Sequence, residues 1–156
     1  MANSTPGMPT PHPALKRLDH LVGTWTMTGN LIGSDEETIT GTATYTWLPG
    51  GFFLVQEVEI DFAGMVNVRS HELIGYDPET DTFPSTVYSN MAPEPLPYRW
   101  TVREDGFSIS VTHGVLDATY TGTFSADGTS MSGGWRPNPG ADETVNISYD
   151  VRGTRA

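Results

Sequence analysis

The pattern that most constrains the fold of this chain is a switch from helical to strand-like spacing within residues 21–29, LVGTWTMTG. A helix repeats about every 3.6 residues, whereas a strand alternates its side chains between two faces. From here the alternation continues almost to the end of the chain, interrupted by turn sequences such as Pro-Gly-Gly at 49–51 and Asp-Gly at 127–128. No long helical pattern supports a parallel crossover. The sequence therefore predicts an all-β fold, an antiparallel up-and-down β-barrel of about ten strands.

The predicted elements follow from this spacing. One short amphipathic helix is expected over residues 13–22, lying across a barrel mouth. Its apolar residues Leu15, Leu18 and Leu21 share one face, and Pro13 suits the first turn. The predicted strands cover residues 24–32, 37–47, 52–62, 65–76, 82–90, 98–103, 106–113, 118–124, 130–136 and 143–152.

The chain is predicted to form a single domain. Its 156 residues are enough to bury one core without cross-links. Residues 1–13 contain four prolines and no apolar run, so we expect a disordered tail followed by one barrel domain at 14–156. The proline-containing stretches 91–97 and 137–142 are predicted to leave the sheet and rim a barrel mouth, because proline cannot donate to a strand ladder.

Composition excludes several classes of protein and of site. The absence of cysteine excludes a disulfide framework and a thiolate metal site, and it favours a cytoplasmic location. The first residues lack the apolar core of a secretory signal, and no later segment is long and apolar enough to span a bilayer. The net charge of -11 opposes nucleic-acid binding, because phosphate contacts need Lys and Arg.

Alternation also predicts which side chains face the barrel interior. Along residues 38–47 the threonines share one face, so the Gly, Ala, Tyr and Trp residues of the other face should point inward. Trp25 is expected to plug the end at which the first strand enters. An aromatic interior with few polar groups is typical of a small-molecule cavity. The candidate ligand-binding residues are Trp25, Tyr45, Trp47, Gln56, Tyr88, Tyr98, Trp100, Tyr120 and Trp135.

The inward face of residues 65–76 has two interpretations. If Ala63-Gly64 is a two-residue turn, His71 points inward, and this is the register we favour. Apolar patterning alone would instead turn the valines and the isoleucine of this stretch inward, together with Glu72. Either register brings one titratable group inside.

His71 and His113 are the candidate catalytic residues. A histidine has a pKa near neutrality and can serve as acid, base or ligand, and His113 ends an apolar face. We predict no metal site, because the four histidines are scattered and no His, Asp or Glu cluster has ligand spacing.

Several short segments occur in an order typical of one protein family. They are LDHLVGTW at 18–25, GTATYTWLPGGFFL at 41–54, IGYD at 74–77, FSADG at 124–128 and GW at 134–135. In this order they resemble a lipocalin-like (calycin) group of bacterial proteins of unknown function, over residues 15–155. The resemblance implies an up-and-down barrel with a central cavity and no settled activity.

Nitrobindin-like haem barrels are distant relatives of that group and share an early Gly-x-Trp, here residues 23–25. The resemblance implies an iron-ligating histidine late in the chain. This chain has VRGTR at 151–155 instead, and no histidine follows His113. We therefore do not expect haem, and we predict no cofactor.

Two functions are open from the sequence. The first is a binding module that encloses a small hydrophobic or aromatic molecule in the barrel cavity. The alternative is a cofactor-independent enzyme, an isomerase, a cyclase or a proton-transfer enzyme, that uses the same cavity with His71 or His113 as acid or base. We expect no nucleic-acid or membrane partner. A homodimer is an open alternative, because incomplete closure would leave a strand edge free to pair.

Overall fold

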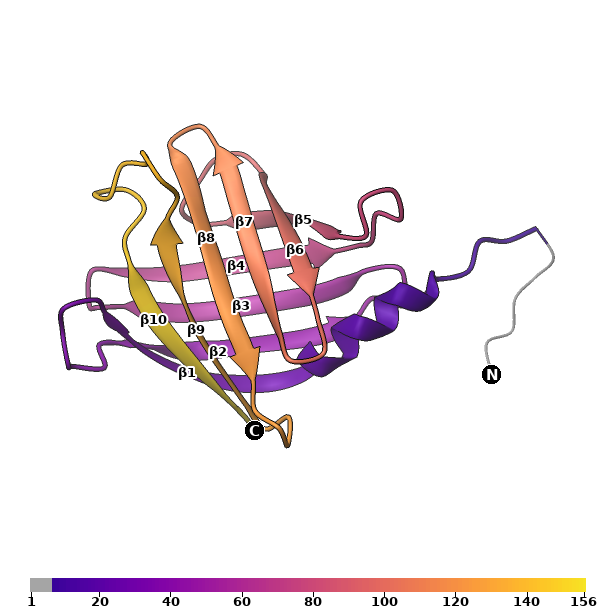
Figure 1. The fold of residues 1–156 in the computed structure, drawn as a ribbon, viewed down its shortest axis with the longest axis horizontal. Helices are drawn as coiled ribbons and strands as arrows, with labels where there is room; N and C mark the ends of the chain where they lie inside the picture. The colour runs from indigo at the N-terminus through magenta and orange to yellow at the C-terminus, as the bar shows by residue number, and fades with distance from the viewer. Residues whose placement is uncertain (1–6) are drawn as a thin grey trace.

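The computed structural model describes residues 7–156 and confirms the predicted fold class, an all-β closed antiparallel barrel of ten strands (Figure 1). Each strand pairs with its neighbours along the chain, and the first pairs with the last. The strands are β1 (Gly23–Leu31), β2 (Ile39–Trp47), β3 (Leu54–Phe62), β4 (Val66–Ile74), β5 (Phe83–Ser89), β6 (Leu96–Val102), β7 (Gly106–His113), β8 (Leu116–Phe124), β9 (Ser130–Pro137) and β10 (Tyr149–Arg155). All ten predicted strands are present, and the last shows the largest change of boundaries.

Closure of the barrel comes from the pairing of β1 with β10. The register runs from Trp25 opposite Arg155 to Leu31 opposite Tyr149. Among the described residues, the first and last strands therefore offer no free edge of the kind through which a homodimer could pair. Dimer formation itself stays a prediction.

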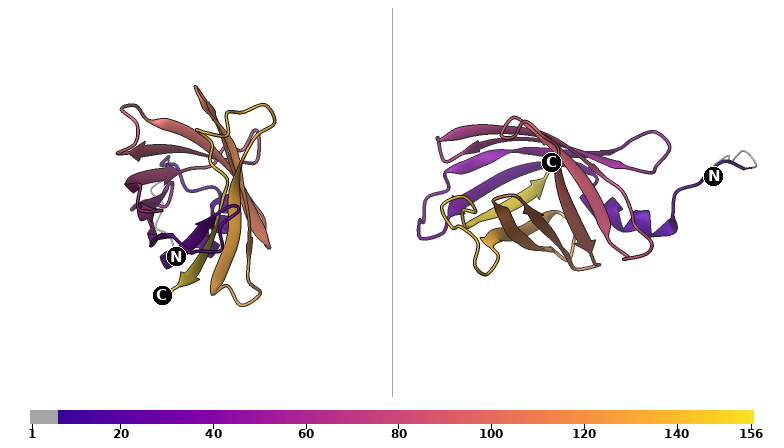
Figure 2. Two further views of the ribbon diagram at one scale, coloured as in Figure 1. Left: turned by 90° about the vertical axis from the view of Figure 1, so that its left-hand side faces the viewer. Right: turned by 90° about the horizontal axis from the view of Figure 1, so that it is seen from above.

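A 3-10 helix, η1 (Pro13–Leu21), covers one end of the barrel, as predicted (Figures 1 and 2). Its leucines Leu15, Leu18 and Leu21 are buried in the barrel core. The loops between β5 and β6, β7 and β8, and β9 and β10 gather at the opposite end (Figure 1). No helix within residues 7–156 has the length and apolar content needed to cross a membrane.

The predicted tail over residues 1–13 falls partly outside the described residues, which begin at 7. The last two residues of this predicted tail, His12 and Pro13, lie against the end of the barrel. Pro13 begins η1, and Nδ1 of His12 accepts a hydrogen bond from the backbone N–H of Ala14 (3.0 Å). The His12 ring also packs on Tyr76, with ring centroids 4.6 Å apart. The barrel domain therefore includes residues 12 and 13.

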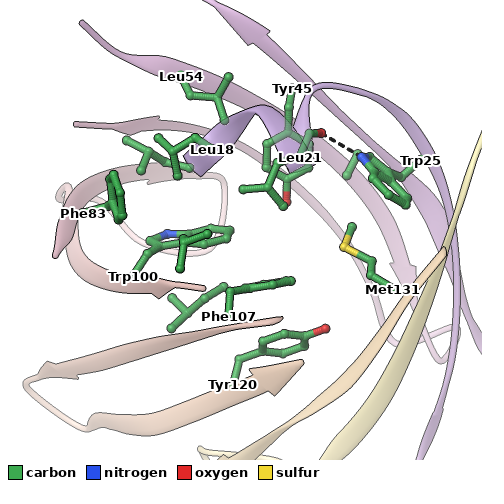
Figure 3. Packing of buried hydrophobic residues seen from close by; sticks show 14 of the residues in the cluster. Leu18, Leu21, Trp25, Tyr45, Leu54, Phe83, Trp100, Phe107, Tyr120 and Met131 are labelled. Carbon is green, nitrogen blue, oxygen red and sulfur yellow. Dashed lines mark hydrogen bonds between the residues drawn. The ribbon is translucent and has the colours of Figure 1, made fainter. Parts of the chain in front are cut away.

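Trp25 and Arg155 fasten the helix to the barrel. The fully buried indole of Trp25 donates to the carbonyl of Leu21 (2.8 Å; Figure 3). The Arg155 guanidinium lies 4.3 Å from the centroid of the Trp25 ring and donates to the carbonyls of His20 (2.8 Å) and Val22. Trp25 thus lies at the end where the first strand enters, and the last strand is tied to the end of the helix.

The start of the last strand was predicted wrongly. We expected a strand over residues 143–152, but Val145 and Ile147 precede β10 and are 42% and 38% exposed. Asp142 gives the reason: its carboxylate accepts hydrogen bonds from the backbone N–H (2.9 Å) and the hydroxyl (2.6 Å) of Thr144. This side-chain turn removes the segment from the ladder.

Two prolines expected to leave the sheet lie within it. Pro97 pairs with Thr86 near the start of β6, and Pro137 pairs with Ala118 at the end of β9. A missing N–H costs little at a strand end, so these positions tolerate proline. The irregular connections are therefore shifted to residues 90–95 and 138–148.

The register between β3 and β4 differs from the one we favoured. Ala63 and Gly64 form the predicted turn, with φ of 55° and 71°, and the N–H of Met65 donates to the carbonyl of Phe62 (2.9 Å). However, Phe62 pairs with Val66 and not with Met65. Met65 is an additional residue in the connection between β3 and β4, and it inverts every side chain that follows. The register indicated by apolar patterning is the one present.

Leu18 allows a test of how much the helix stabilises the barrel. Its side chain is 0% exposed, so Leu18→Ala should leave a void under η1 and lower the free energy of unfolding by about 2–5 kcal/mol. Urea denaturation measures this. The exposed Lys16→Ala on the same helix should change stability by less than about 0.5 kcal/mol. Equal, small effects for both variants would show that η1 lies outside the cooperative core.

Candidate functional site

The barrel encloses a cavity of about 200 Å³ to which all ten strands contribute. Most of the side chains in its wall are aromatic or aliphatic, as the alternation predicted. The lining residues are Met27, Ala43, Tyr45, Gln56, Val58, Ile60, Val68, Ser70, Glu72, Val87, Tyr98, Trp100, Phe107, Ile109, Tyr120, Met131, Trp135, Tyr149 and Val151. No Lys, Arg or His is among them.

Six of the nine candidate ligand-binding residues are in this wall. They are Tyr45, Gln56, Tyr98, Trp100, Tyr120 and Trp135. Each lies on a strand whose inward face the period-2 pattern identified without ambiguity. The structure therefore brings together most of the predicted aromatic wall.

The other three candidates, Trp25, Trp47 and Tyr88, lie outside the cavity wall, contrary to expectation. Trp25 is used in packing under the helix. Trp47 lies at the same end, where its indole donates to the carboxylate of Asp19 in η1 (2.9 Å). Tyr88 is on the outer face of β5 and is 52% exposed, because Val87 is the inward residue at that point of the strand.

Three rings from adjacent strands form a stack along the cavity wall. Trp100 stacks on Phe107 with ring centroids 5.3 Å apart, and Phe107 stacks on Tyr120 at 5.2 Å (Figure 3). Tyr120 also meets Trp135 at 5.8 Å. This run of ring faces and edges is a rigid apolar surface for a flat molecule.

Glu72 is the one acidic side chain in the wall, and it is 6% exposed. Its Oε2 accepts two hydrogen bonds, from the hydroxyl of Ser85 (2.6 Å) and from the indole N–H of Trp100 (2.8 Å). Burial raises the pKa of Glu72 above its ordinary value, although both hydrogen bonds act in the opposite direction.

The second carboxylate oxygen of Glu72 is open to the cavity. Oε1 accepts no hydrogen bond from residues 7–156, yet every fully enclosed side-chain N or O atom of these residues has a partner. Oε1 must therefore be accessible, and the space beside this inward residue is the cavity. The carboxyl group is therefore held by one oxygen only.

Phenol hydroxyls provide the other polar points. Those of Tyr98, Tyr120 and Tyr149 make no hydrogen bond within the described residues, and by the same reasoning they contact open space. Burial, together with the charge of Glu72, raises the pKa of Tyr98 to about 12. Burial likewise raises the pKa values of Tyr120 and Tyr149. All three hydroxyls are therefore neutral hydrogen-bonding groups near pH 7.

Two glycines give the Tyr120 ring its space. A Cβ on Gly122 would lie 2.8 Å from the Tyr120 hydroxyl oxygen, and one on Gly133 would lie 2.7 Å from it. Any side chain at either position would push the phenol from its place. On the opposite wall, Nε2 of Gln56 donates to the Tyr45 hydroxyl oxygen (2.6 Å), and burial raises the pKa of Tyr45.

The inward placement predicted for His71 is wrong. The extra residue Met65 turns His71 to the outer face, where its side chain is 63% exposed and Nδ1 lies 3.6 Å from Oε1 of Glu57. It cannot reach a molecule inside the barrel. Glu72, the group carried inward by the other register, takes its place.

His113 lies at the open end of the barrel and does not line the inner cavity. It is the last residue of β7, and Nε2 is 3.0 Å from Oε1 of Glu94 in the loop between β5 and β6. The two predicted histidines are therefore not brought together. No group of three or more His, Cys, Asp or Glu side chains within residues 7–156 could hold a metal ion.

An outer chamber of about 670 Å³ lies at this mouth. It shares Val68, Ser70, Val87 and Tyr98 with the wall of the inner cavity, so the two spaces adjoin. The loop at 90–95 contributes to it, in agreement with the prediction that this loop rims a mouth. Exposed apolar side chains of Met91, Val115 and Val145 also line the chamber.

Some wall residues were missed in choosing the candidates. Glu72 was present only in the register that we did not favour. Phe107, Met131, Tyr149 and Val151 were on predicted inward faces, and they could have been included by taking each inward face in full.

The raised pKa of Glu72 predicts a pH-dependent stability. A carboxyl group whose pKa is raised on folding does not lower the free energy of unfolding at pH values below its unfolded pKa of about 4.5. The loss of stability grows as the pH rises from that value through the folded pKa. Glu72→Gln keeps an acceptor for Ser85 and Trp100 but never ionises. Its Tm should equal that of the natural protein near pH 4 and exceed it near pH 8, where about 1 kcal/mol corresponds to roughly 2–4 °C.

Differential scanning calorimetry at both pH values measures this difference. Glu57→Gln, on the exposed outer face of β3, removes the same charge without touching the cavity. If the Glu72→Gln effect were the same at both pH values, or matched that of Glu57→Gln, Glu72 would not be an ionisable group with a raised pKa.

Comparison with known proteins supports the lipocalin-like barrel and adds no activity. None of the curated proteins compared with the chain matches it. Residues 10–126 match a family described as "Protein of unknown function (DUF1579)". Because this match spans most of the chain, from the approach to η1 through β8, the chain belongs to the DUF1579 family.

Proposed function

We propose that this protein binds a small hydrophobic or aromatic molecule inside the barrel. The observation that supports this most directly is the enclosed cavity, in which stacked rings form the wall and a few polar groups face the space. A mostly apolar pocket with a small number of placed hydrogen-bonding groups is the usual form of a small-molecule site.

The volume of the cavity limits the size of the ligand. An engineered apolar cavity of about 150 Å³ in another protein binds benzene, so a space of about 200 Å³ suits a single substituted aromatic ring. A longer substituent would extend past Val68 and Val87 into the chamber at the mouth. Exposed apolar side chains at this rim favour entry of an apolar molecule from the same end.

We further propose that the site works without a cofactor. The barrel is proposed to be of the calycin type and distantly related to nitrobindins, and the protein is proposed to be located in the cytoplasm. Haem does not suit the donor set: His71 faces outward, and His113 lies at the mouth beside Glu94. An axial ligand to iron is needed inside the barrel, but the described cavity wall offers no histidine or cysteine, and its methionines Met27 and Met131 line a space of only about 200 Å³.

A proton-transfer enzyme is a second candidate, and Glu72 is the observation that favours it. His71 cannot act as the acid or base inside the barrel, because it faces outward. A buried carboxyl group with a raised pKa, in the same cavity as neutral phenol donors, can serve as the acid and base instead. Glu72 would remove a proton from a carbon next to a carbonyl group. The Tyr98 and Tyr120 hydroxyls would donate hydrogen bonds to the enolate oxygen, and the proton would return from the acid.

Hydrogen exchange tests this second candidate. In D2O, the protein should exchange the methyl hydrogens of acetophenone for deuterium faster than buffer does, as followed by proton NMR. Glu72→Gln should remove the acceleration, with Glu57→Gln as the matched control. A natural protein that exchanges no faster than buffer would leave binding as the function and reject this candidate.

Cavity binding is tested with toluene and benzyl alcohol in tryptophan fluorescence titrations, because Trp100 and Trp135 lie in the wall. Both probes should change the emission saturably. Val68→Phe places a ring between the inner cavity and the mouth, and it should weaken binding at least about tenfold, or 1.4 kcal/mol.

Val55→Phe is the matched control, because Val55 lies on β3 next to inward residues but faces outward. It should bind both probes like the natural protein. No saturable response to either probe in the natural protein would reject the proposed function, and equal losses in both variants would show that the ligand is not inside the barrel.

A further inference from the structure

Glu72 has no positively charged partner. Its two donors, Ser85 and Trp100, are neutral, and the cavity wall contains no Lys, Arg or His. The titratable groups that share the cavity with it are the phenols Tyr45 on β2, Tyr98 on β6, Tyr120 on β8 and Tyr149 on β10. None of these can neutralise a carboxylate, because a tyrosine is either neutral or negative.

The rings around the cavity suit a cation as well as an apolar body. The faces of Trp and Tyr rings attract positive charge, and aromatic cages of this kind recognise ammonium groups. Trp100 contacts Glu72 through its indole N–H, and Tyr120 and Trp135 supply further rings to the same cavity wall. The two features together form a site for a positively charged head on an aromatic body.

Negative charges outside the cavity also favour a positively charged ligand. The net charge of -11 attracts cations to the protein as a whole. At the mouth, Glu94 places a second carboxylate in the wall of the outer chamber, 3.0 Å from Nε2 of His113. A positively charged molecule would therefore be favoured on approach as well as in the bound state.

From this geometry we propose that the guest is an aromatic amine, whose protonated nitrogen donates to Oε1 of Glu72 while its ring lies on the wall formed by Trp100, Phe107 and Tyr120. This rests on the proposed binding function and names its ligand class. The nitrogen must carry at least one N–H, because Oε1 is a free hydrogen-bond acceptor. The phenol oxygens of Tyr98 and Tyr149 can accept from further N–H groups of a primary ammonium.

The test compares benzylamine, benzyl alcohol and benzoate by fluorescence or isothermal titration near pH 8. The first two have the same size and differ in charge. Benzylamine should bind at least about tenfold more tightly than benzyl alcohol, since loss of one partner of a buried charge pair costs more than 1.4 kcal/mol. Benzoate should bind most weakly, because its carboxylate would face Glu72.

Glu72→Gln should abolish the preference for benzylamine over benzyl alcohol. Binding of toluene, which makes no hydrogen bond to Glu72, shows that the variant is folded. Glu57→Gln removes an equal charge from the outer face and should keep the preference for benzylamine. If Glu72→Gln does not fold, the selectivity of the natural protein between the two probes decides the matter.

The outcomes separate the two proposals. Equal affinity for benzylamine and benzyl alcohol, or a preference for benzyl alcohol, overturns the amine assignment and leaves the binding function intact. A preference for benzylamine that survives Glu72→Gln also overturns it, because the charge would then be recognised elsewhere. Absence of binding by any of the probes, toluene included, overturns the binding function and the amine assignment together.

Discussion

Closure of the sheet by β1 and β10 is the constraint on which the rest of the structure depends. When every strand is paired on both sides, each side chain points either into the barrel or away from it, and the register at each hairpin decides which. The contact of Arg155 with Trp25 connects this closure to the helix that covers one end. The side chains that line the cavity are therefore set by the register of each strand pair.

The burial of Glu72 is the feature that stability alone does not favour. A carboxyl group in an apolar interior is costly without an opposite charge, and an aliphatic residue there would pack between its neighbours without that cost. Ser85 and Trp100 offset part of the cost by hydrogen bonds to one oxygen. The other oxygen has no partner among the described residues, and under the proposed function ligand recognition would offset this loss of stability.

Most of the fold, but less of the site, could be predicted from the sequence. Strict alternation along β2, β3 and β8 placed Tyr45, Gln56 and Tyr120 in the wall, because one face of each strand is clearly more apolar. On β4 the pattern was weaker, and a single unpaired residue, Met65, decided between His71 and Glu72. Such an extra residue depends on how the whole barrel closes, and the turn sequence does not reveal it.

The two ends of the barrel differ in how their side chains are packed. At the covered end, fully buried side chains of η1 and Trp25 form a tight plug that unfolding must disrupt. At the mouth, polar contacts hold the rim: the buried Asn146 accepts from the N–H of Asp117 (2.9 Å) and donates to the carbonyl of Val115 (3.0 Å). Under the proposed function, a ligand would enter through the outer chamber past Val68, at the end away from the plug. Substitutions at the plug should therefore destabilise the fold, whereas replacing the carboxyl of Glu72 should remove an electrostatic cost at high pH.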